Sequence, residues 1–193
     1  MRVKSKWFKS GRAKTPQEIA DAMAFIIWRT GMNALKNTRK ADFDVAAGPQ
    51  YFAFLNEFLI FLVQVADRIA FDRLGADERE AFTTALAVRL ADIVADNQAE
   101  LLGGEAGEHK SNFIAQLNRR AGEYAEFHFE SSGPNFAFVR YLGYCMLDVA
   151  IEKDKNWVVD QMASIEAPDA VETMEKAMRG LLEATPAKNP LEA

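Results

Sequence analysis

The sequence has too few cysteines for a disulfide framework. Cys145 is the only cysteine among the 193 residues, so an internal disulfide and a cysteine-based zinc site are both excluded. It lies within the apolar run YLGYCML, where a thiol is typically buried and unreactive. We therefore expect Cys145 to fill space in the core and not to act as a nucleophile.

Long hydrophobic runs are also missing. The longest uncharged stretch of the most apolar segment is 58–66, which has nine residues, whereas a membrane-spanning helix needs about 20. The first apolar run of any length begins near Ile19 and lacks a secretory cleavage pattern. We expect a cytoplasmic protein.

Positive charge is scarce everywhere except at the N-terminus. The formal net charge is −5, but residues 1–14 hold six cations and no acid, so the remaining residues carry 17 basic against 28 acidic side chains, a net −11. This surplus of acids argues against a broad nucleic-acid-binding face, because phosphate contacts need clustered cations.

Residues 1–14, here called the N-terminal arm, are the one segment expected to contact an anionic partner. This basic flexible arm surrounds Trp7 and Phe8 with cations, which suits binding to anionic lipid headgroups or nucleic-acid phosphates with the rings inserting or stacking. The alternative, to which we give more weight, is a solubilising tail that partly docks Trp7 and Phe8 on the rest of the chain. The candidate contact residues are Lys4, Lys6, Trp7, Lys9, Arg12 and Lys14.

Few glycines and prolines, together with many aromatic residues, favour an all-α fold. The chain has 11 Gly and 6 Pro against 14 Phe and 3 Trp. Apolar residues recur at helical spacing, and Thr15 with Glu18 forms a capping box before the first helix. We predict a bundle of six or seven helices in one domain over 15–185, followed by a tail over 186–193. The expected features are helices over 16–37, 48–74, 77–102, 110–124 and 134–152, further helices over 154–185 with one starting at Pro168, a second capping box at Asp77 and Glu80, and a mobile loop over 103–110.

The two most apolar segments resemble each other. Both begin with Gly-Pro, in GPQYFAFLNEFLIFLVQVAD from Gly48 and in GPNFAFVRYLGYCMLDVA from Gly133, and five of fifteen positions are identical between 52–66 and 136–150. The matches are nearly all apolar, so such a repeat preserves packing and not chemistry. We predict two similar halves, about 15–75 and 77–152, related by a pseudo-twofold axis with the helices 48–74 and 133–152 adjacent at the centre. Chance similarity between two amphipathic helices is the alternative.

Acidic residues and one histidine precede these two helices in short connectors that alternate polar with apolar residues. If a pseudo-dyad brought the connectors together, carboxylates and an imidazole could hold a divalent cation such as Mn²⁺, Fe²⁺ or Zn²⁺. A solvated acidic rim is the interpretation that we prefer. The candidate ligands are Asp42, Asp44, Glu126, His128 and Glu130.

Polar residues within the two apolar helices give a third candidate, a ligand pocket between the helices. Its polar contacts would be Glu57, Gln64, Tyr141 and Asp148. The sequence contains no nucleophile elbow, phosphate loop, dinucleotide fingerprint or zinc-protease pattern.

These observations favour a non-enzymatic helical interaction or scaffold protein without a cofactor. We expect it to self-associate, because so many large apolar residues can exceed what a core of this size hides. The alternative is a divalent-metal-binding protein or metal-dependent enzyme that uses the acidic residues and histidine of the connectors.

Overall fold

The computed structural model describes residues 14–130 and 133–183. Within these ranges the protein is all-α, as predicted, and the one strand pair is two residues long on each side. Every helix described is too short or too polar to cross a membrane. The elements are α1 (Pro16–Lys40), α2 (Pro49–Phe71), α3 (Ala76–Leu102), α4 (Ala106–Tyr124), β1 (Phe129–Glu130), β2 (Gly133–Pro134), α5 (Phe136–Leu147), α6 (Lys155–Gln161), the π-helical turn η2 (Met162–Glu166) and α7 (Ala167–Glu183).

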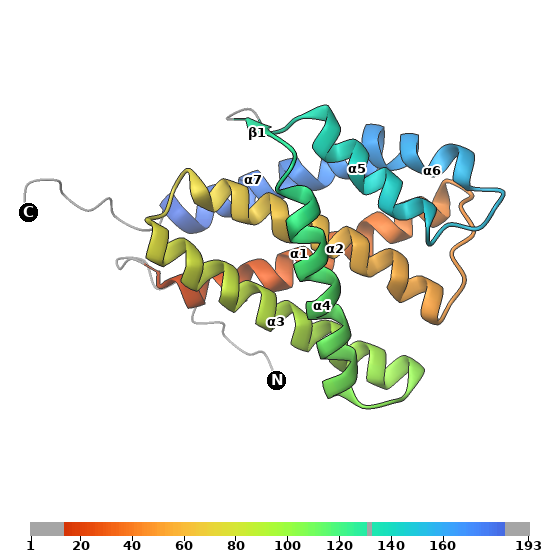
Figure 1. Ribbon diagram of the computed structural model, residues 1–193, viewed down its shortest axis with the longest axis horizontal. Coiled ribbons are helices and arrows are strands. Elements are labelled where there is room, and N and C mark those ends of the chain that lie inside the picture. The colour runs from red at the N-terminus through yellow and green to blue at the C-terminus, as the bar shows by residue number, and fades with distance from the viewer. Residues whose placement is uncertain (1–13, 131–132, 184–193) are drawn as a thin grey trace, which may run out of the picture.

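Helix α2 is the centre of the fold. It contacts α1, α3, α4, α5 and α7, and Figure 1 shows it crossing the middle of the molecule. Fifteen of its 23 residues are buried, including Phe58 and Phe61, which are fully inaccessible to solvent. Because the apolar arc of α2 exceeds half a turn, several neighbouring helices are needed to bury it.

The capping box at the start of α1 forms as predicted. The Thr15 hydroxyl accepts a hydrogen bond from the Glu18 backbone N–H at 3.2 Å, and the Glu18 carboxylate accepts one from the Thr15 N–H at 3.0 Å. The second predicted capping box, at Asp77 and Glu80, is wrong. Gly75 takes the N-cap position in an extended conformation, and its N–H donates to the Glu78 carboxylate at 3.4 Å.

The predicted mobile loop over 103–110 is also wrong, because α4 begins at Ala106. Gly103 and Gly104 have φ angles of 77° and 85°, a region that favours glycine, and together they turn the chain within a few residues. His109 therefore lies in the first turns of α4, where its Nε2 is 2.8 Å from the Gly103 carbonyl oxygen.

The internal repeat is not confirmed. Pro49 is the first residue of α2, but Gly133 and Pro134 pair with Phe129 and Glu130 in the strand pair, and the helix that follows begins at Phe136. Asn135 caps that helix by accepting from the Phe138 N–H at 2.9 Å, so α5 is shorter than the predicted helix over 134–152. Helices α2 and α5 are in contact, yet α2 is enclosed whereas α5 keeps an exposed face.

The C-terminal helices form one continuous helical run. Helix α6 passes through η2 directly into α7, so Pro168 lies in the first turn of α7 and not after a break. Helix α6 packs closely on α5, because a Cβ atom at Gly143 would lie 2.9 Å from the Val159 Cα atom. Figure 1 shows α5 and α6 together at one edge of the molecule.

Candidate functional site

A buried ionic network joins α2, α4 and α5. The Arg120 guanidinium of α4 donates to both oxygens of Glu57 on α2, through Nε at 2.9 and 3.2 Å and through Nη2 at 2.7 Å. Its Nη1 donates to Glu123 at 2.9 Å and to the Tyr141 hydroxyl of α5 at 3.0 Å. The Tyr141 hydroxyl donates to Glu123 at 2.6 Å, and the Gln116 amide donates to Glu57 at 2.9 Å. One guanidinium thus connects three helices.

The Glu57–Arg120 ion pair of the network is buried, whereas Glu123 is partly exposed. The side chains of Glu57 and Arg120 are 5% and 9% exposed. Burial alone would lower the pKa of Arg120, but its hydrogen bonds to Glu57 and Glu123 outweigh this effect, so the pKa is raised. The hydrogen bond from Tyr141 and the proximity of Arg120 lower the pKa of Glu123 against the effect of burial. Arg120 is therefore a cation that lies between Glu57 and Glu123.

Two further groups beside the network stay protonated. Burial raises the pKa of the Cys145 thiol to about 12, and the neighbouring Glu57 charge adds to this effect. Burial likewise raises the pKa of Tyr124 well above its usual value, and its hydroxyl has no hydrogen-bond partner among the described residues. Because the thiolate is the reactive form of cysteine, Cys145 is an inert core thiol here.

The four residues predicted for a ligand pocket lie in three different places in the structure. Glu57 and Tyr141 both bind the Arg120 guanidinium, Glu57 through Nε and Nη2 and Tyr141 through Nη1. Gln64 is 8% exposed, two turns further along α2. Asp148 is exposed at the C-terminal end of α5.

The five candidate metal ligands lie near opposite ends of α2. The Asp44 N–H donates to the Asp154 carboxylate at 2.7 Å, close to the start of α2. Glu130 shares a small cavity with Ile69 and Asp72, at the end of α2. A helix of 23 residues is about 35 Å long, so the structure does not bring Asp42 and Asp44 to Glu126, His128 and Glu130. Among the described residues, no group of three or more His, Cys, Asp or Glu side chains could hold a metal ion.

Of the six residues predicted to contact an anionic partner, Lys4, Lys6, Trp7, Lys9 and Arg12 lie outside the described residues. Lys14 lies within them, and its Nζ donates to the Leu181 carbonyl oxygen of α7 at 3.3 Å. Lys14, the last residue of the N-terminal arm, therefore lies next to the C-terminal part of α7.

Arg120, the centre of the buried network, was not identified from the sequence. Arg120 is 8% exposed. The signal was Glu57 itself, a carboxylate within the most apolar helix, which needs a buried cation as its partner. The spacing of Arg120 and Glu123 on one face of α4 was a second indication.

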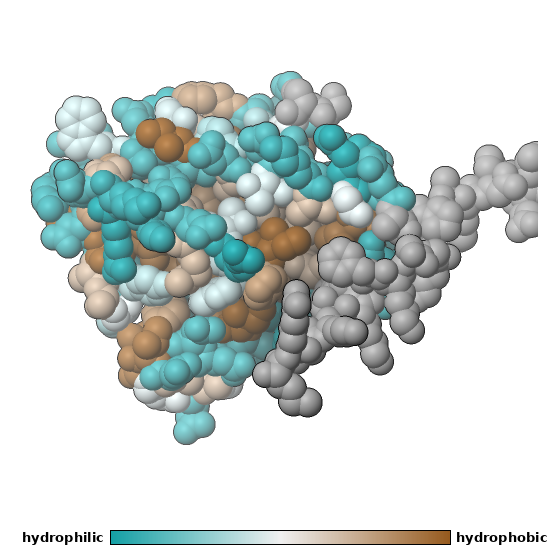
Figure 2. Space-filling view, turned by 180° about the vertical axis from the view of Figure 1, so that it is seen from behind, coloured by the Kyte–Doolittle hydropathy of each residue, from teal (hydrophilic) through white to brown (hydrophobic). Residues whose placement is uncertain are grey.

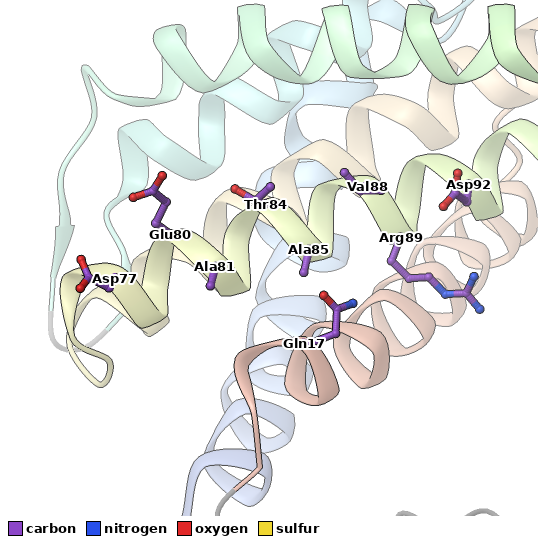
Figure 3. A pocket seen from close by; sticks show the side chains of 9 residues that line it. All are labelled: Gln17, Asp77, Glu80, Ala81, Thr84, Ala85, Val88, Arg89 and Asp92. Atoms are coloured by element: carbon purple, nitrogen blue, oxygen red, sulfur yellow. The ribbon is translucent and has the colours of Figure 1, made fainter.

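An open groove runs between α1 and α3, with a volume of about 650 Å³. Figure 3 shows Gln17 of α1 directed toward Ala85 of α3, with Ala81 and Arg89 on the same side of α3. The face of α3 that lines the groove, here called the α3 stripe, has Asp77 and Glu80 at one end, Arg89 and Asp92 at the other, and small apolar side chains between them. The lining residues are Gln17, Asp77, Glu80, Ala81, Thr84, Ala85, Val88, Arg89 and Asp92.

No family model, curated protein or solved structure matches the chain.

Proposed function

We propose that this chain is a non-enzymatic, cytoplasmic helical interaction protein that self-associates, and that its N-terminal arm contacts an anionic partner. The buried network supports a structural role for the most strongly perturbed ionisable groups, since they bind one another. The exposed surface of helix α5 supports the interaction role.

The exposed face of α5 presents two aromatic rings and a guanidinium. Phe136 is 69% exposed and Tyr144 is 47% exposed. Arg140 lies between them along the helix, with its guanidinium carbon 5.7 Å from the Phe136 ring centre and 5.3 Å from the Tyr144 ring centre. We call these three residues the α5 stripe. Aromatic and arginine side chains are those most often found at the energetic centres of protein interfaces.

A second copy of the chain is the partner that the α5 stripe fits best. In a twofold contact the same patch meets itself, so the rings and guanidinium of one copy pack against the rings and guanidinium of the other. Figure 2 shows hydrophobic side chains on the rear face as separate patches between hydrophilic residues.

Sedimentation velocity of the full chain over a range of concentrations tests this proposal. We expect the wild-type protein to associate reversibly and Phe136→Ala/Tyr144→Ala to weaken the association by about tenfold or more. Phe25→Ala, which removes a ring that is 56% exposed from α1, is the control and should leave the association unchanged. A wild-type protein that stays monomeric at all concentrations, or equal effects of the two variants, would contradict self-association through α5.

The role of the N-terminal arm is tested separately. Replacing Lys4, Lys6 and Lys9 with glutamine in the full chain should remove salt-sensitive binding to phosphatidylserine vesicles or to single-stranded DNA. The variant should keep the wild-type unfolding temperature, because it changes none of the buried residues of the described helices. Binding that is unaffected by these substitutions would refute an anionic-partner role for the arm.

A further inference from the structure

The groove between α1 and α3 is suited to a basic segment that contains apolar residues. Its α3 stripe runs from Asp77 to Asp92, a length of about 22 Å at the helical rise. Asp77 and Glu80 lie at one end. Arg89 and Asp92 lie at the other end, and Asp92 pairs with Lys110 at 2.5 Å, so the surplus of acidic side chains is at the Asp77 end. The middle is formed by Ala81, Ala85 and Val88, the last of which is 43% exposed.

The N-terminal arm has the complementary pattern. Its residues 1–13 contain five cations and no acid, and Trp7 and Phe8 lie between cations on both sides. We propose that residues 1–13 dock in the groove between α1 and α3 of the same chain, with cations at the end formed by Asp77 and Glu80 and the two rings over the small apolar residues. Such an arrangement removes the rings from water and places cations of the arm next to carboxylates of the groove.

The arm is long enough and begins close enough to reach the groove. Lys14 is three residues before Gln17, which itself lines the groove. Trp7 is seven residues before Lys14 and can lie up to about 24 Å from it in an extended chain, which matches the length of the α3 stripe. Because the arm is attached, its effective concentration at the groove is in the millimolar range, so contacts that are weak individually are sufficient for docking.

Docking in the groove and binding to an anionic partner use the same cations. The arm therefore cannot do both at once, and an anionic partner must displace it from α3. This consequence rests on the proposed function of the arm, whereas docking itself depends only on the groove and the sequence of residues 1–13.

Limited digestion of the full chain with trypsin tests the docking, because trypsin cleaves after Lys4, Lys6, Lys9 and Arg12 only when the arm has left the groove. Asp77→Asn/Glu80→Gln should be cleaved within residues 1–13 roughly two- to thirtyfold faster than the wild-type protein, the factor that corresponds to losing two exposed ion pairs. Raising the salt concentration should accelerate cleavage of the wild-type arm in the same way.

Asp148→Asn/Asp160→Asn is the matched control, since it neutralises two exposed acids far from the groove in sequence, and it should be cleaved at the wild-type rate. Carbodiimide cross-linking of the wild-type chain should join the arm lysines to Asp77 or Glu80 within one copy. Equal cleavage rates in all three proteins, or cross-links only between copies, would overturn the docking. Vesicle binding measured in the same proteins distinguishes the docking proposal from the anionic-partner proposal. If the arm binds vesicles but is cleaved at the same rate in every variant, the anionic-partner proposal stands and the docking proposal is refuted.

Discussion

The buried network predicts a large and specific response to removal of its cation. Arg120→Met keeps much of the side-chain volume but leaves the Glu57 carboxylate, which is 5% exposed, without its counter-charge. Leaving a buried charge without its partner costs about 3–5 kcal/mol, a large fraction of the ~5–15 kcal/mol that stabilises a typical domain. We therefore expect Arg120→Met to lower the free energy of unfolding by that amount, measured by urea denaturation followed by far-ultraviolet circular dichroism.

Two further variants make this prediction sharp. Arg119→Met makes the same substitution at the neighbouring exposed position and should change the free energy of unfolding by less than about 0.5 kcal/mol. Glu57→Met/Arg120→Met removes both charges and should recover most of the loss, because a buried ion pair is often replaceable by apolar side chains of similar volume. If Arg120→Met proved no more destabilising than Arg119→Met, or if the double variant were as unstable as Arg120→Met, the network would not be the pairing interaction described here.

Three further predictions concern packing and pH. Phe54→Ala should lower the free energy of unfolding by about 3–5 kcal/mol, because Phe54 is 2% exposed; urea denaturation measures this, and a loss below 1 kcal/mol would contradict the burial. Gly143→Ala should destabilise the protein by about 1–3 kcal/mol, since its Cβ would meet the backbone of α6. Gly180→Ala, which has open space at its Cβ, should stabilise α7 slightly. Equal unfolding temperatures for the two variants would refute the close contact at Gly143. Burial raises the pKa of Glu166 against hydrogen bonds from Gln161 and Asn37, so the carboxylate form weakens the fold above that pKa. Glu166→Gln should therefore stabilise the protein at pH 7 and lose this advantage as the pH falls through the carboxyl range, and an advantage that is constant with pH would contradict the assignment.

The fold was predictable from the sequence where local signals and burial agreed. The capping box of Thr15 and Glu18 predicted the start of α1. The wide apolar arc of 48–74 predicted a central helix. Errors occurred where tertiary contacts decided the outcome. Gly133 and Pro134 read as a helix start identical to Gly48 and Pro49, but pairing with Phe129 and Glu130 takes them into a strand pair, and no local pattern distinguishes the two situations.

The candidate sites were less predictable, because side chains distant in sequence compose them. Glu57 and Tyr141 were correctly selected as unusual polar residues within apolar helices, but the cation that joins them, Arg120, belongs to a third helix whose packing angle the sequence does not specify. The acidic connectors illustrate the opposite error. Their grouping required the two connectors to meet, and the length of α2 keeps them apart.

The central position of α2 has a consequence for synthesis of the chain. This helix is covered by elements that precede it and by elements that follow it, and α7 is the last of them. About 100 residues separate the end of α2 from the start of α7, so at about 5–20 residues per second the ribosome takes roughly 5–20 s to supply the covering helix. Until then, the side of α2 that α7 covers in the folded protein remains exposed on the nascent chain.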